Sequence, residues 1–135
     1  MMMPLTFQQT ATVEAMRCVR TGRGFSLVRV APAGWAALDA EMDVLANVLG
    51  ATLRRTDTVL RTRDREIGVV LIESVEEQVQ PPLERIRAAA AVHLPKLELR
   101  IGWASVGPGH RRSWEEAWRW AGQLLVADAA VPAAA

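Results

Sequence analysis

The segment that decides the fold of this chain is Thr56–Leu71, with the sequence TDTVLRTRDREIGVVL. Residues 59–61 and 67–72 carry most of the apolar side chains here, and the residues between them are strongly charged. Two short apolar runs joined by a few polar residues are typical of a β-hairpin. The segment therefore predicts two antiparallel strands with a tight, charged tip.

Helical patterns lie on both sides of this hairpin. Apolar residues recur at helical spacing over residues 7–20, 36–54 and 82–93, and again from residue 113 to about residue 127. The last of these segments opens with Ser113 followed by Glu116, which is a capping-box pattern. Four helices are therefore expected.

Two further strands are expected at residues 25–30 and 97–103, the second because apolar and polar residues alternate along it. The resulting order, α-β-α-β-β-α-β-α, predicts an α+β domain. We expect a two-layer sandwich with helices around a central mixed or antiparallel sheet. The pattern leaves ferredoxin-like, cyclase-like and related sandwiches open, and residues 131–135 are expected to fray.

Composition excludes several classes of protein. The 135 residues suit one domain, and half of them are apolar, which is enough for a sizeable core. A net charge of +1 argues against a nucleic-acid partner or an acidic membrane surface. No apolar run is long enough to insert into a membrane, and the start of the chain lacks the pattern of a signal peptide. The single cysteine, Cys18, fits a reducing compartment. We expect a cytoplasmic protein.

In order along the chain, five segments resemble landmarks of the GGDEF family, the diguanylate cyclases. Residues 25–30 are similar to the first family strand, 45–57 to the helix ending in Arg-x-x-Asp, and 59–71 to the signature hairpin. Residues 100–104 and 114–125 are similar to a later strand and to the closing helix. The resemblance implies a cyclase-like α+β fold.

This resemblance also divides the chain. Residues 1–23 are expected to form a leading helix, 24–128 the GGDEF-like domain, and 129–135 an alanine- and proline-rich tail.

The positions that carry the family's chemistry are changed. Members condense two GTP molecules into cyclic di-GMP with two metal ions held by carboxylates. The motif Gly-Gly-Asp/Glu-Glu-Phe falls on Arg63, Asp64, Arg65, Glu66 and Ile67, and the aspartate ending the first strand is Ala31. The metal-binding carboxylate is thus replaced by Arg65, and Glu66 alone cannot hold two metals. The resemblance implies a degenerate pseudo-enzyme with no catalytic residues, metal or cofactor.

A ligand site upstream of this motif is retained in sequence. Arg54 and Asp57 match the Arg-x-x-Asp with which many cyclases bind cyclic di-GMP. An arginine fork can bind phosphate or the Hoogsteen edge of guanine, and aspartate can accept from guanine N–H groups. The alternative is structural, with Arg54 at a helix carboxyl end and Asp57 in a turn. Arg61 and Asp64 also match the pattern, so it is not specific.

The last helix carries candidate interface residues. Trp114 and Trp118 are four residues apart and share a face, whereas Trp120 points elsewhere. Three tryptophans cannot all be buried on one side of a helix, and an exposed tryptophan beside Arg119 is typical of an interface anchor. The candidates are Trp114, Trp118, Arg119 and Trp120.

Together these observations predict a non-catalytic GGDEF-like regulatory module that acts by protein–protein interaction in a bacterial signalling complex. Its partner is expected to be another protein or a second copy of the chain. The alternative is a cyclic di-GMP receptor that uses Arg54 and Asp57. A nucleic-acid role ranks third and an active cyclase last.

Overall fold

The computed structural model describes residues 3–33, 39–110, 112–128 and 131–132. Its elements are α1 (Leu5–Thr21), β1 (Phe25–Pro32), α2 (Asp39–Thr52), β2 (Thr58–Arg63), β3 (Glu66–Ile72), a 3-10 turn η1 (Glu76–Val79), α3 (Gln80–His93), β4 (Glu98–Val106), α4 (Trp114–Ala127) and β5 (Val131–Pro132).

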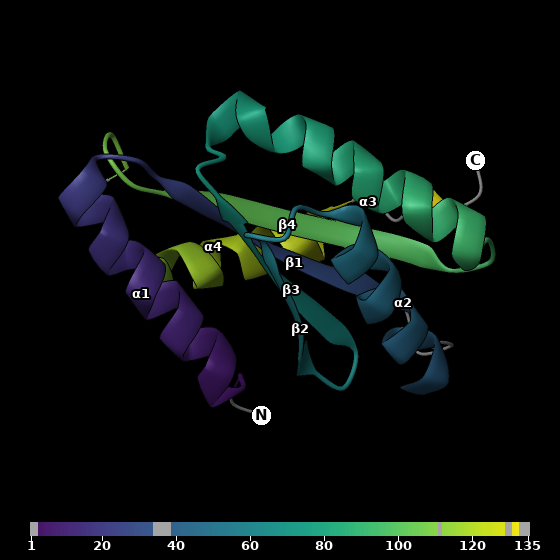
Figure 1. Cartoon of the computed structure of the whole chain (residues 1–135). Coiled ribbons are helices and arrows are strands. Elements are labelled where there is room, and N and C mark those ends of the chain that lie inside the picture. Colours follow the sequence, from purple (N-terminus) through teal and green to yellow (C-terminus); the bar gives the residue numbers. More distant parts are fainter. Residues whose placement is uncertain (1–2, 34–38, 111, 129–130, 133–135) are drawn as a thin grey trace.

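The α+β class and the element order expected from the sequence are confirmed (Figure 1). Residues 36–38 of the expected second helix lie outside the described residues. One difference is in the tail, where fraying was expected. There, Val131 and Pro132 pair with Leu99 and Glu98 as the short strand β5.

The sheet has the order β2-β3-β1-β4-β5, and every neighbouring pair of strands is antiparallel. β1 lies at its centre between β3 and β4, which is why all its residues from Phe25 to Val30 are buried. The antiparallel alternative of the sequence prediction is therefore the observed one.

Helices cover both faces of the sheet (Figure 1). The residues that alternate along β1 divide between two cores. Val28 and Val30 pack in the core beneath α2 and α3, whereas Phe25 and Leu27 pack in the core beneath α1 and α4. The domain thus has three layers rather than the two expected, because both faces of the central strands are apolar.

Local sequence explains where α4 begins and where α1 ends. The Ser113 hydroxyl accepts the backbone N–H of Glu116 at 3.1 Å, and the Glu116 carboxylate accepts the backbone N–H of Ser113 at 3.4 Å. This is the expected capping box of α4. α1 ends at Gly22, whose φ of 72° lies in the left-handed region that glycine adopts freely.

The predicted hairpin is present, and its tip is as tight as the sequence suggested. β2 and β3 are joined by Asp64 and Arg65 alone. Neither residue has a positive φ, and the pairing register shifts between Arg61 and Arg63. This bulge lets the chain reverse without the glycines that mirror-image hairpin turns favour.

Among the residues that the structure describes, no helix is both long and apolar enough to cross a membrane.

Candidate functional site

The candidate ligand site lies where the chain passes from α2 to β2. Arg54 and Asp57 flank a tight turn in which the Asp57 N–H donates to the Arg54 carbonyl at 3.0 Å. The Arg54 guanidinium donates to both Asp57 carboxylate oxygens at 3.3 Å. The two predicted residues are therefore together, but they bind each other.

Asp57 is used inside the fold. Its side chain is 1% exposed, and its carboxylate accepts the backbone N–H of Arg54 at 3.2 Å and that of Ile72 at 3.0 Å. It therefore fastens the end of β3 to the turn that leads into β2. This is the structural role that the sequence left open as the alternative.

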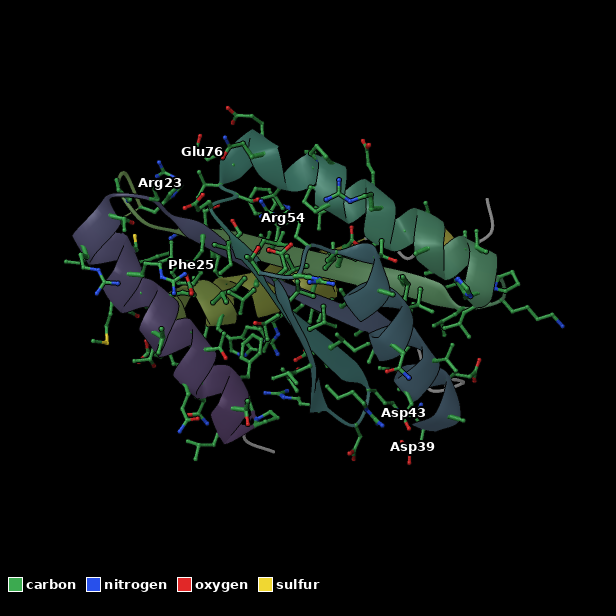
Figure 2. All side chains as sticks on the ribbon, in the orientation of Figure 1. Arg23, Phe25, Asp39, Asp43, Arg54 and Glu76 are labelled. Atoms are coloured by element: carbon green, nitrogen blue, oxygen red, sulfur yellow. The ribbon has the colours of Figure 1, made fainter. Side chains whose placement is uncertain are left out.

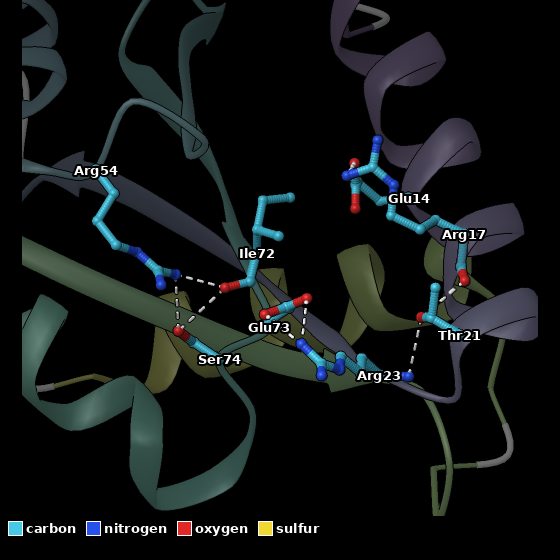
Figure 3. Close-up of polar contacts among 8 residues, drawn as sticks. All are labelled: Glu14, Arg17, Thr21, Arg23, Arg54, Ile72, Glu73 and Ser74. Carbon is cyan, nitrogen blue, oxygen red and sulfur yellow. Dashed lines mark hydrogen bonds and ion pairs between the residues drawn. The ribbon is translucent and has the colours of Figure 1, made fainter.

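Arg54 remains accessible on one side. Its side chain is 51% exposed, and its guanidinium also donates to the carbonyl of Ile72 and, at 3.2 Å, to the Ser74 hydroxyl (Figure 3). An arginine held in this way presents a fixed, partly solvated positive charge. It can meet an anion without a large loss of side-chain entropy.

The residues of the altered motif surround the hairpin tip. Arg63 and Asp64 are exposed, Arg65 is half-buried, and Ile67 lies in the core beneath α2 and α3. The register of β1 and β3 places Val30 opposite Ile67. Ala31, the next residue along β1, therefore lies beside the tip.

The tip is tied to the amino-terminal part of α2 by an arginine. Arg61 donates to the Asp43 carboxylate at 2.8 Å, to the Asp39 carboxylate at 3.2 Å and to the Asp64 carbonyl at 2.6 Å. Figure 2 shows Asp39 and Asp43 near one another at this end of α2. The hydrogen bond to Asp43 is the main cause that raises the pKa of Arg61 above its ordinary value. These contacts fix the hairpin against the helix.

Glu66, the carboxylate retained from the motif, is buried in an ion pair. Its Oε1 accepts from Arg29 Nη2 at 2.8 Å and from Arg29 Nε at 3.0 Å, and its Oε2 accepts from the Thr62 hydroxyl at 3.0 Å. The Arg29 and Glu66 side chains are 9% and 7% exposed. Both carboxylate oxygens therefore have partners within the fold.

The Arg29 side chain is enclosed by α4 as well. It donates to the Trp118 carbonyl at 3.0 Å, and its guanidinium carbon lies 4.4 Å from the centre of the Trp118 ring. Sequence reasoning missed this residue as part of the site. The available signal was an arginine inside the apolar strand FSLVRV, since an arginine is seldom buried without a partner.

The tryptophans of α4 do not form one surface. Trp118 is buried against Phe7, with ring centres 4.8 Å apart, so its expected place at an interface is corrected to the core. Trp114 is partly buried against the same core. Trp120 is 50% exposed and Arg119 is exposed, so these two remain available to a partner.

Two further groups bear on site chemistry. Within the part of the chain that the structure describes, no cluster of three or more His, Cys, Asp or Glu residues is placed to hold a metal ion. Cys18 is a buried free thiol, and burial raises its pKa above the usual value. It therefore has the character of a structural cysteine rather than a nucleophile.

No protein-family model and no curated protein matches the sequence. Solved structures do match. The chain is similar to the diguanylate cyclase SiaD of Pseudomonas aeruginosa, solved with its activator SiaC, at 16% identity and a TM-score of 0.77. The match covers 90% of this chain but only 52% of the SiaD chain.

Two other structures match over most of their length. A diguanylate cyclase protein from Thermotoga maritima matches at 17% identity and a TM-score of 0.72, with 92% of each chain covered. The GGDEF domain of DgcB from Caulobacter crescentus, solved with cyclic di-GMP, matches at 16% identity and a TM-score of 0.75. That match covers 90% of this chain and 81% of the other. The fold is thus that of GGDEF domains.

Proposed function

We propose that this chain is a non-catalytic GGDEF-like module that regulates a bacterial signalling complex by binding another protein. The observation that carries the proposal is the buried pairing of Glu66 with Arg29. A two-metal site for phosphoryl transfer needs carboxylate oxygens that are free to bind magnesium. Here both oxygens of Glu66 already have partners.

The neighbouring positions support the same conclusion. Arg65 brings a positive charge to the position of a metal-binding carboxylate, and Ala31 offers no ligand at the other. The residues present therefore do not fit a pair of divalent cations. Exposed Trp120 and Arg119 on α4 provide surface for a partner instead.

Incubation with GTP and either magnesium or manganese tests the absence of cyclase activity. We expect no cyclic di-GMP above that formed by the Glu66→Gln variant, with product measured by chromatography and mass spectrometry. An active diguanylate cyclase serves as the positive control. Turnover by the unaltered chain that Glu66→Gln removes would show that the domain is an enzyme.

A second candidate function is binding of cyclic di-GMP through Arg54 and Asp57. Half the Arg54 side chain is accessible, and the solved DgcB domain holds cyclic di-GMP. The ligand would have to compete for Asp57, whose carboxylate binds two backbone amides and Arg54. We therefore rank receptor function below partner binding.

Calorimetric titration with cyclic di-GMP separates the two candidates. The proposed interaction module gives no binding heat at ligand concentrations up to about 1 mM, the range of weak association. A receptor gives heat that Arg54→Ala abolishes and that Arg55→Ala, at the neighbouring exposed arginine, leaves in place. Thermal unfolding of both variants checks that loss of the Arg54 contacts has not unfolded the turn.

A further inference from the structure

The outer edge of β4 is open over part of its length. The Ile101 N–H points away from β1 and donates to the Asp128 carboxylate at 2.8 Å. In an antiparallel ladder, backbone groups alternate between the two sides of a strand. The N–H and carbonyl groups of Trp103 and Ser105 therefore face the same outer side as the N–H of Ile101.

Among the described residues, only β5 pairs with this edge, and it reaches no further than Glu98 and Leu99. An uncovered strand edge is a template for another chain, and proteins commonly block it with charge or proline. The residues beyond Ile101, from Gly102 to Ser105, have the sequence GWAS and contain neither.

A groove of about 480 Å³ runs along this edge. Trp103, Ala104 and Ser105 of β4 contribute to its lining. One wall is apolar and comes from Trp120 and Leu124 of α4, which are 50% and 38% exposed.

The other wall is acidic and polar. It comes from Glu76 and Glu77 of η1 and from Gln80 at the start of α3, and His110 and Arg112 complete the lining of the groove. Figure 2 labels Glu76 at the η1 end of this wall. The groove therefore has different chemistry on its two sides, with the strand edge between them.

Polar contacts flank the open part of the edge. At the Ile101 end, the Asp128 carboxylate also pairs with Arg87 of α3 at 3.2 Å. At the other end, His110 Nε2 lies 3.1 Å from a Glu76 carboxylate oxygen. The open edge between them has the length of a short peptide strand.

We propose that this groove binds an extended segment of a partner polypeptide, which adds to β4 as an antiparallel strand. The inference rests on the proposed interaction function and gives it a surface. β5 already adds to the same edge in this direction. The acidic side of the groove favours a segment with basic side chains, which the GWAS edge of a second copy does not carry.

Strand geometry specifies the side chains of this segment. Directly opposed residues point to the same face of a sheet. Residues opposite Trp103 and Ser105 would point toward Glu76 and Glu77, where lysine or arginine is favoured. The residue opposite Ala104 would point toward Trp120 and Leu124, where an apolar side chain is favoured.

The probe is a short blocked peptide in which valine and lysine alternate, compared with one in which valine and glutamate alternate. We expect the lysine peptide to bind more tightly, and the backbone amides of Trp103 and Ser105 to shift and gain protection from hydrogen exchange in NMR spectra. N-methylation of the lysines, whose N–H groups face β4, should abolish binding. N-methylation of the valines, whose N–H groups face away, should not.

Variants of the whole chain locate the walls. Trp120→Ala should weaken the lysine peptide about tenfold, as expected for truncation of an interface anchor. Val126→Ala, at an exposed residue of the same helix outside the groove lining, is its control. Glu77→Lys should favour the glutamate peptide over the lysine peptide, whereas Glu115→Lys at the start of α4 should leave the preference unchanged.

Several results would overturn the inference. One is equal binding of the two N-methylated peptides, and another is the absence of shifts at Trp103 and Ser105. Concentration-dependent shifts of these amides without peptide would identify a second copy as the occupant. If a native partner binds equally well to the Trp120→Ala and Glu77→Lys variants, this groove is not the binding surface, but the proposed interaction function still stands. Turnover of GTP would instead contradict the proposed non-catalytic function.

Discussion

At the scale of single residues, Glu66 is held entirely by partners within the fold. A buried carboxylate is tolerated only when it is paired and hydrogen-bonded, and Glu66 receives three hydrogen bonds from Arg29 and Thr62. Arg29 in turn uses the Trp118 carbonyl and ring. Glu66 and Arg29 are therefore part of the contact between the sheet and α4.

Removal of either partner should be costly because it leaves the other charge buried alone. We expect Arg29→Met to lower the free energy of unfolding by about 3–5 kcal/mol, measured by urea denaturation. The double variant Arg29→Met with Glu66→Leu should be more stable than Arg29→Met alone, since it leaves no uncompensated charge.

The matched control is Arg23→Met, which breaks the exposed 3.2 Å pair with Glu73 (Figure 3). Exposed pairs contribute about 1 kcal/mol or less. Equal losses for Arg29→Met and Arg23→Met would show that the buried pair has no special role.

At the scale of elements, contacts between near neighbours in the sequence set the start of α4 and the turn of the hairpin. The capping box of α4 joins residues three apart, and the helix starts at Trp114 as expected. The hairpin tip is likewise local, with a turn of Asp64 and Arg65 and a bulge beside it. Such features were predictable because they depend on a few consecutive residues.

Substitution of Ser113 measures how much the cap of α4 contributes to the free energy of unfolding. Ser113→Ala should lower the free energy of unfolding by about 1 kcal/mol, because the Glu116 N–H loses its acceptor. Ser113→Asn retains an acceptor at the same position and should lower the free energy of unfolding by only about a few tenths of a kcal/mol. A loss with asparagine as large as that with alanine would mean that the cap is not responsible. Both are measured by denaturant unfolding.

At the scale of the whole molecule, the layer formed by α1 and α4 approaches the sheet so closely that Gly102 admits no side chain. A Cβ on Gly102 of β4 would lie 1.9 Å from the Ala121 carbonyl oxygen of α4. This contact brings α4 onto β4 and places Trp120 along the open strand edge. The spacing of the layers thus creates the groove.

Gly102→Ala tests this packing. The added methyl meets the backbone of α4, so we expect the free energy of unfolding to fall by about 1–3 kcal/mol. We also expect the NMR shifts of the backbone amides along α4 to change. Gly50→Ala is the control, since nothing lies within 4 Å of its Cβ in the helix α2. That change should stabilise by about 0.5–1 kcal/mol through helix propensity. Tolerance of alanine at Gly102 would contradict the close contact.

Sequence patterns were less informative about the sites than about the fold. They predicted that Arg54 and Asp57 lie in one turn. They could not show that the Asp57 side chain is 1% exposed or that its carboxylate accepts the N–H of Ile72, fifteen residues away. They also placed Trp118 among the surface candidates. Its burial against Phe7 depends on α1 packing on the sheet beside α4. The spacing of residues within α4 cannot predict that contact.

The sequence by itself determined the class of the domain, the order of its elements, the charged hairpin and the cap of α4. These follow from periodicity and from interactions between residues close in the chain. Only the tertiary structure decided that Arg29 neutralises Glu66 from 37 residues away, that Asp57 is enclosed, and that β4 keeps an open edge beside Trp120. Each of these depends on strand register and on the distance between packed layers, which are set by the whole fold at once.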